Sequence, residues 1–261
     1  MNLMQLVLSI GSFNLAYLLI IVFTSSKLEN LNILTIGSFL LIPLTAWLGM
    51  LLQSVFNISD VADRQLVANV LLTFWTLKFC TYNRSFKLLI LRYLLNKDLH
   101  IRGLNLYEKT KNLVFFIVCL MIVLMPIISL NFLSGNLGLE IIDILAALVF
   151  LLGAGYEVKA LNELKKSPYK LNAKLHQQGL WFLSRHPDLL GQLIAWWGIY
   201  FLALGAYGGE WSFLGPVLTT YLYVKYFVID VEMKLTRKYE DYTSYKASTP
   251  SILPKITFLK S

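Results

Sequence analysis

Long apolar segments recur along the whole chain, and few charges interrupt them. A helix needs about 20 apolar residues to cross the hydrocarbon core of a bilayer, and in lipid a helix satisfies its own backbone hydrogen bonds. The segments of suitable length are, in chain order, residues 3–23, 33–56, 66–83, 113–133, 138–156, 188–205 and 212–230. We therefore predict an all-α polytopic membrane protein, a seven-transmembrane helical bundle that forms one integral membrane domain over residues 1–261.

The composition favours a membrane protein and argues against a nucleic-acid-binding protein. Hydrophobic residues make up 57% of the chain, charged residues make up 15%, and the mean hydropathy is +0.62. The net charge of +8 could attract nucleic acid, but the basic residues fall in loops between apolar segments, as membrane orientation requires. We expect membrane lipids, and no nucleic acid, among the partners.

Basic and non-basic loops alternate along the chain. Three stretches, 84–112, 157–187 and the tail from Lys234, carry most of the lysine and arginine residues outside the spans. The loops on the other side of the spans contain one basic residue, Arg64. Because basic loops stay in the cytosol, we expect the N-terminus outside and the C-terminus cytosolic.

No group of cysteine, histidine or carboxylate residues has the spacing of a metal site. Cys80 and Cys119 each lie inside an apolar segment, which indicates buried thiols rather than a disulfide or a ligand pair. His100 and His176 lie in loops, outside any H-E-x-x-H arrangement. We expect no metal cofactor.

The stretch at residues 173–198, AKLHQQGLWFLSRHPDLLGQLIAWWG, joins a basic loop to an apolar helix. Pro187 suits the first turn of a helix but cannot continue a preceding one, so we predict a helix that starts at Pro187 or the next residue. Ser184, Arg185 and His186 would then lie around unpaired backbone N–H groups at the positive end of the helix dipole, where an anion is stabilised. The alternative is a basic membrane-flanking loop before an ordinary transmembrane helix with interfacial tryptophans.

This stretch resembles the core motif of the steroid 5α-reductase superfamily, most closely its bacterial branch of uncharacterised membrane proteins, in which a pattern like GLW-x-x-SRHPNY-x-GE-x-x-x-WW recurs. The matching residues are Gly179, Leu180, Trp181, Ser184, Arg185, His186, Pro187, Gly191, Trp196 and Trp197. Three positions depart from the pattern: Asp188 replaces Asn, Leu189 replaces Tyr and Gln192 replaces Glu. A second match, similar to the terminal motif of the family, comprises Glu232, Leu235, Tyr239, Tyr242, Tyr245 and Ile252-Leu-Pro254. The resemblance covers most of residues 150–255 and marks them as a reductase-like cofactor-binding region.

The resemblance implies that NADPH enters from the cytosol between the last helices. No G-x-G-x-x-G motif follows a strand, so the helical bundle itself would have to hold such a cofactor. Carried over position by position, the cavity would be lined by Lys174, Arg185, His186, Asp188, Gln192 and Trp196, with Glu232 and Tyr239 closing it from the tail. Asp188 would be unfavourable near phosphates, whereas Gln192 can still bind an amide or a ribose hydroxyl.

Chemistry of this family type transfers hydride to the β-carbon of an enone while an acid protonates or hydrogen-bonds the carbonyl oxygen. A neutral tyrosine in an apolar site suits that role, and Tyr82, near the inner end of the third span, is the best-placed candidate. Its alternative role is that of an interfacial aromatic residue. Because a charge in lipid is costly, we also expect Lys225 to point inward or snorkel, and Glu157 to face the mouth of the cavity.

The resemblance therefore predicts an NADPH-dependent oxidoreductase that reduces a carbon–carbon double bond in a lipophilic enone from the bilayer, such as a 3-oxo-Δ4-steroid. One alternative is an S-adenosylmethionine-dependent membrane methyltransferase of the isoprenylcysteine or phospholipid type, a family with a similar Arg-His-Pro turn and Glu-x-x-Leu tail. Another is a non-catalytic lipid-binding relative, which the substitutions at Asp188, Leu189 and Gln192 motivate. The expected location is the bacterial inner (cytoplasmic) membrane, and the sequence indicates no oligomeric state.

Overall fold

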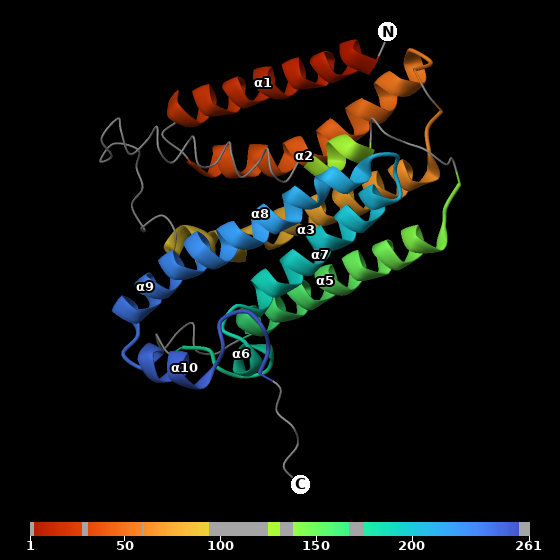
Figure 1. Ribbon diagram of the computed structural model, residues 1–261. Helices are drawn as coiled ribbons and strands as arrows, with labels where there is room; N and C mark the ends of the chain where they lie inside the picture. The colour runs from red at the N-terminus through yellow and green to blue at the C-terminus, as the bar shows by residue number, and fades with distance from the viewer. Residues whose placement is uncertain are drawn as a thin grey trace.

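The described part of the chain contains helices and no strands, which confirms the predicted all-α class there (Figure 1). A computed structural model describes residues 3–27, 31–58, 60–93, 125–130, 138–166 and 175–255. The helices are α1 (Leu3–Lys27), α2 (Leu31–Val55), α3 (Asp63–Tyr93), α5 (Ile141–Lys166), α6 (Leu180–Leu183), α7 (Pro187–Leu204), η3 (Gly209–Phe213), α8 (Leu214–Leu222), η4 (Tyr223–Phe227), α9 (Val228–Lys238) and α10 (Tyr242–Ser248). One long helical segment, Gly209–Lys238, consists of η3, α8, η4 and α9, which follow one another without a gap.

Four of the described helical segments, not the expected seven, are long and apolar enough to cross a membrane. They are Met4–Thr24, Ile141–Lys166, Pro187–Leu204 and Gly209–Lys238. The apolar part described for α2, Leu40–Val55, is too short, and α3 carries charged residues at both ends of its apolar centre. The expected span at 113–133 lies mostly outside the described residues.

Two helices run further than the sequence pattern predicted. The helix α5 continues without a break through the charged stretch Lys159–Lys166, beyond residue 156, where we expected its span to end. Likewise α3 passes unbroken through Arg84 to Tyr93, beyond residue 83, where we expected its span to end. Since no proline or glycine interrupts either junction, the backbone hydrogen bonds continue across it.

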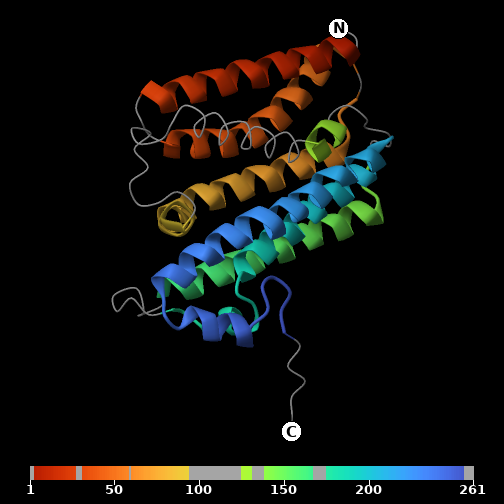
Figure 2. The same cartoon turned by 60° about the vertical axis from the view of Figure 1, so that its left-hand side comes forward.

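The antiparallel helices α5 and α7 pack so closely that their backbones touch (Figure 2). A Cβ atom on Gly153 would lie 2.5 Å from the backbone nitrogen of Ala195, and one on Gly191 would lie 2.5 Å from that of Glu157. Helices in lipid associate through such close contacts between small residues. Gly153 and Gly191 therefore allow α5 and α7 to form the central pair of the bundle.

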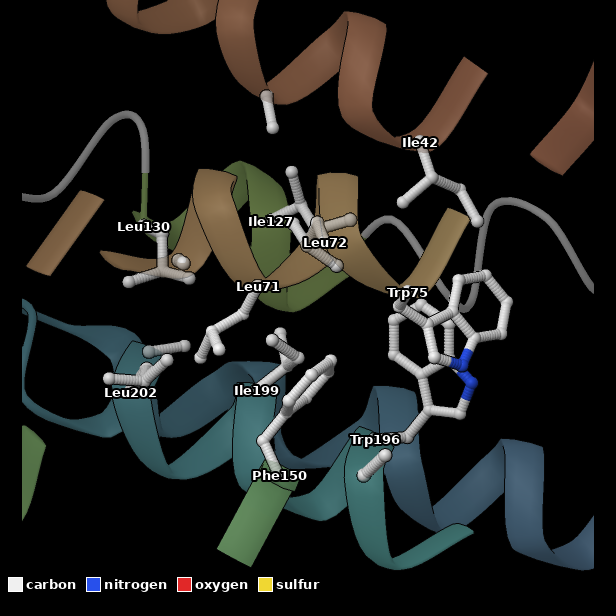
Figure 3. Close-up of a cluster of buried hydrophobic side chains, with 14 of the residues drawn as sticks. Ile42, Leu71, Leu72, Trp75, Ile127, Leu130, Phe150, Trp196, Ile199 and Leu202 are labelled. Atoms are coloured by element: carbon white, nitrogen blue, oxygen red, sulfur yellow. The ribbon is translucent and has the colours of Figure 1, made fainter. Parts of the chain in front are cut away.

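A buried apolar core joins this pair to α3 (Figure 3). Trp75 of α3 lies edge-to-face with Trp196 of α7, and their ring centroids are 5.2 Å apart. Phe150 of α5 and Ile199 of α7 continue the contact along the bundle. The core fixes how α3 lies against α7, and thereby the positions of the polar residues that follow Trp75 and precede Trp196.

A buried ion pair connects α3 to α5 at the end of the bundle where both helices begin. Arg64, the one basic residue expected in a loop on that side, lies fully buried in the first turn of α3. Its Nη2 is 3.4 Å from Oδ2 of Asp143, which also accepts a hydrogen bond from the backbone N–H of Glu140. Gly205 leaves room for the guanidinium, since a Cβ there would lie 2.6 Å from Nη1 of Arg64.

The short helices α6 and α10 lie across the other end of the bundle, where α5 and α9 finish and α7 begins (Figures 1 and 2). We call this the motif end, because residues 179–187 and 239–254 meet there. It brings the two sequence motifs together although about one fifth of the chain separates them.

Candidate functional site

The Gly179-Leu180-Trp181 motif attaches the motif end to α5. Gly179 has a φ of 61°, a conformation that favours glycine, and a Cβ there would lie 2.5 Å from Oε2 of Glu163. That carboxylate accepts a hydrogen bond of 2.8 Å from the backbone N–H of Leu180. The Trp181 indole donates to the carbonyl of Ala160 at 3.0 Å. These contacts fix where the next loop, Ser184 to His186, begins.

The tail of the chain satisfies the backbone of this loop. The N–H groups of Arg185 and His186 donate to the carbonyls of Pro250 and Ser251, at 2.9 and 3.0 Å. The Ser184 hydroxyl donates to the carbonyl of Ile252 at 2.8 Å. The terminal motif therefore supplies hydrogen-bond acceptors for the N–H groups of Arg185 and His186, and these two groups are not open to an anion. An anion at the loop would have to be held by side chains.

Three basic side chains of the motif end surround one carboxylate. Oε1 of Glu232, on α9, lies 3.0 Å from Nη2 of Arg185 and 3.4 Å from Nε2 of His186. Its Oε2 lies 3.0 Å from Nζ of Lys246, on α10. Arg185, His186 and Glu232 are buried, whereas Lys246 is half exposed. Since two permanent cations face one carboxylate, the cluster carries a net positive charge even when His186 is neutral.

Two buried tyrosines of α10 complete this cluster. The Tyr245 hydroxyl donates to the carbonyl of Trp181, and the Tyr242 hydroxyl has no hydrogen-bond partner among the described residues. Burial raises the pKa of both phenols, and the carboxylate of Glu232 raises that of Tyr242 further. Both phenols therefore stay neutral at physiological pH, so Tyr242 can donate a hydrogen bond to a bound group.

A second polar cluster lies inside the bundle, beside the tryptophan pair. Lys78 of α3 forms an ion pair with Glu157 of α5, and both side chains are buried. The Lys78 ammonium lies 5.5 Å from the ring centroid of Trp75, whose ring meets Trp196. Burying two charges requires close pairing, because each loses its hydration. Glu157 therefore lies inside the bundle, with Lys78 as its partner.

One face of α7 links the two clusters. Asp188, Gln192 and Trp196 follow one another at intervals of four residues, and all three are buried. The Tyr223 hydroxyl of η4 donates to Oε1 of Gln192 at 2.9 Å. Oδ1 of Asp188 has no hydrogen-bond partner in the described structure, and its carboxylate interacts electrostatically with Glu157 and His186. The buried side chains of this face, which we call the polar path, thus extend from the Arg185 loop to Trp196.

A family model described as "Protein of unknown function (DUF1295)" matches residues 42–249, which is most of the chain. The chain belongs to the DUF1295 family. Searches of curated proteins and of solved structures found no significant match. The DUF1295 match includes both polar clusters and ends one residue before Pro250, the first of the tail residues that hold the Arg185 loop.

The remaining predicted residues of this DUF1295 protein are Tyr239, Lys225, Tyr82 and Lys174. Tyr239 is partly buried and packs against the apolar cluster of Leu235, Tyr242 and Tyr245. Lys225 is exposed on η4, which excludes the inward placement and agrees with the snorkelling one. Tyr82 belongs to α3, but its side chain lies outside the described structure, as does all of Lys174.

Sequence reasoning missed several residues of the two clusters. Lys246 and Tyr242 belong to the terminal motif, yet nothing in its spacing shows that they face Glu232. Lys78 and Glu157 are 79 residues apart, and only the packing of α3 on α5 pairs them. The one available signal was their position as charges inside apolar helices, which marks functional candidates but identifies no partner. No group of three or more metal-ligating side chains gathers in the part of the chain that the structure describes.

Proposed function

We propose that the protein is an NADPH-dependent reductase of a carbon–carbon double bond in a lipophilic enone, such as a 3-oxo-Δ4-steroid. The DUF1295 family is in the steroid 5α-reductase-like group, which agrees with the motif resemblance. The observation that carries the proposal is the polar path along α7. It joins a cationic cluster at the end of the bundle to a buried Lys78–Glu157 pair beside Trp196. An anionic cofactor needs cations to bind its phosphates, and hydride transfer needs a site that excludes water. The two clusters at the ends of the path could meet these two needs.

The side chains of the cationic cluster fit the anionic part of NADPH. Nε of Arg185 and the hydroxyl of Tyr242 are buried without hydrogen-bond partners among the described residues, and both are donors. Lys246 is exposed enough to turn from Glu232 toward a phosphate. Gln192 and Trp196, further along α7, would hold the nicotinamide end through amide hydrogen bonds and ring contact. Bound there, NADPH would supply the hydride.

The reaction also needs a proton donor, because hydride addition to an enone leaves an enolate. We retain Tyr82 as one candidate, and Lys78 is a second, one helical turn earlier on α3 and thus near the same face. As an ammonium paired with Glu157, Lys78 could donate a hydrogen bond or a proton to the carbonyl oxygen of the substrate. It would recover the proton from solvent through the polar path along α7.

The arrangement of helix ends supports the proposed orientation. The basic residues Lys166, Lys238 and Lys246 all lie at the motif end, whereas the described basic residue at the other end, Arg64, is buried in an ion pair. Because basic residues stay on the cytosolic side, we place the motif end and the C-terminus in the cytosol, with the N-terminus outside. A bacterial inner membrane would give the site access to cytosolic NADPH and to substrates from the bilayer.

A methyltransferase that uses S-adenosylmethionine is the second candidate. The buried carboxylate of Asp188, with one oxygen lacking a hydrogen-bond partner among the described residues, could face the sulfonium of that cofactor. NADPH and S-adenosylmethionine differ in charge, so their binding separates the two functions.

The test is equilibrium binding of NADPH, NADH and S-adenosylmethionine to the detergent-purified protein. We expect saturable NADPH binding that weakens as salt is added. Arg185→Ala should weaken it roughly tenfold or more, because it removes a charge-assisted hydrogen bond. Lys159→Ala, which removes an exposed charge of α5 outside the cluster, should leave affinity nearly unchanged. Binding of S-adenosylmethionine alone would favour methyl transfer, and binding of none of the three would favour a non-catalytic lipid-binding protein.

A further inference from the structure

A shallow groove of about 310 Å³ lies between α9 and α10, on the outer surface of the motif end. Its lining residues are Ile229, Glu232, Met233, Thr236, Arg237 and Lys246. Only Glu232 and Lys246 belong to the proposed cofactor cluster. The other four residues have no part in the proposed reaction, so the groove needs its own explanation.

The groove changes from apolar to cationic along its length. Ile229, Met233 and Arg237 are spaced four residues apart on α9, so they form one row along the helix. Ile229 and Met233 are 48% and 50% exposed. Arg237 follows in the last turn of α9, which also ends the apolar segment Gly209–Lys238. The cation of this row, Arg237, therefore lies where the apolar segment ends.

Lys246 brings a second cation to the same end of the groove. Its side chain is 53% exposed, and its Nζ contacts Glu232, a carboxylate already paired with Arg185. Arg237 is exposed and makes no ion pair with any described residue. The polar end thus carries uncompensated positive charge next to two exposed apolar side chains.

We propose that this groove binds an anionic phospholipid, with the phosphate held between Arg237 and Lys246 and an acyl chain along Met233 and Ile229. A soluble phosphate compound would use the two cations but leave the apolar row in water. A phospholipid uses both, since its phosphate and acyl chain lie in the same order along the membrane normal as Arg237 and the apolar row. An anionic headgroup is favoured over a zwitterionic one because Arg237 lacks a carboxylate partner. The site does not depend on the proposed reductase activity.

Native mass spectrometry of the full-length protein, titrated separately with phosphatidylglycerol and phosphatidylcholine of the same acyl chains, tests the proposal. We expect the first bound phosphatidylglycerol to have the lower apparent Kd. Arg237→Gln should reduce this preference roughly fivefold, as should Lys246→Gln, because each removes a cation near the headgroup. Lys159→Gln removes an equal charge from α5 outside the groove and should change nothing.

A second pair of measurements distinguishes a lipid from a free anion. Met233→Gln should weaken binding of both lipids, because it removes the apolar contact with the acyl chain. Since Met233 is half exposed, the substitution should leave the fold intact. Excess inorganic phosphate should not displace phosphatidylglycerol. Equal binding of the two lipids, an equal effect of Lys159→Gln and Arg237→Gln, or displacement by inorganic phosphate would each overturn the proposal.

Discussion

Charges buried inside the bundle are the residues whose replacement has the clearest consequences. Lys78 and Glu157 neutralise each other at a position where neither reaches water. A buried pair contributes little net stability compared with apolar residues of the same size, yet either member alone is strongly destabilising. Replacing both residues together therefore removes the charges at little cost in stability, so that a structural role of the pair can be told apart from a catalytic one.

Lys78→Met should destabilise the protein by about 3–5 kcal/mol, because it leaves the Glu157 carboxylate buried without its partner. The double variant Lys78→Met/Glu157→Leu should recover most of that loss, since no charge then remains. Thermal unfolding in detergent measures both. If Lys78 donates the proton in the proposed reduction, the double variant will bind NADPH but turn over no enone. A double variant with normal turnover would leave Tyr82 as the candidate acid, which Tyr82→Phe tests.

At the scale of helices, the contact between α5 and α7 positions the site, because Asp188 and Gln192 lie beside Glu157 only while the two backbones touch. The sequence predicted the span at 188–205 closely, since Pro187 marks its start and its apolar residues continue to Leu204. It did not predict the contact, because glycines inside an apolar segment are equally compatible with helix–helix packing and with exposure to lipid.

Gly153→Ala should therefore destabilise the bundle by about 1–3 kcal/mol or more, because the added methyl group meets the backbone of α7. Gly155 on the same helix is the matched control: a Cβ there meets nothing within 4 Å. Gly155→Ala should be neutral or stabilising by up to about 1 kcal/mol, since alanine favours the helix. Unfolding temperatures of the two variants in one detergent give the comparison, and equal values would mean that the close contact is absent.

For the whole molecule, the motif end depends on segments far apart in the chain. The resemblance correctly brought Arg185, His186 and Glu232 together, because both motifs that contain them were recognised. It could not show that Glu232 is already paired with Arg185 and Lys246, because these contacts depend on how α10 folds back across the bundle. The count of seven spans was too high for the described residues, because hydropathy alone does not fix where helices such as α3 begin and end.

The tail should therefore control the order of the Arg185 loop. A protein ending at Thr249 lacks the carbonyls of Pro250 and Ser251, so hydrogen exchange at the amides of Arg185 and His186 should accelerate roughly fivefold or more. A protein ending at Lys255 keeps those carbonyls and should exchange at the wild-type rate. Hydrogen–deuterium exchange of the peptide that covers the loop provides the measurement, and equal protection in both truncated proteins would contradict this role of the tail.

The same tail contacts have a consequence for how the protein is made. Residues 250–252 leave the ribosome after all four apolar membrane-spanning segments, so the membrane bundle can insert before the loop has its hydrogen-bond acceptors. During that interval the N–H groups of Arg185 and His186 can bond only to water or to another acceptor. If the protein binds the proposed cofactor, its affinity for that cofactor should thus appear late in biogenesis, and a chain released before residue 250 would be inserted in the membrane with the Arg185 loop unfinished.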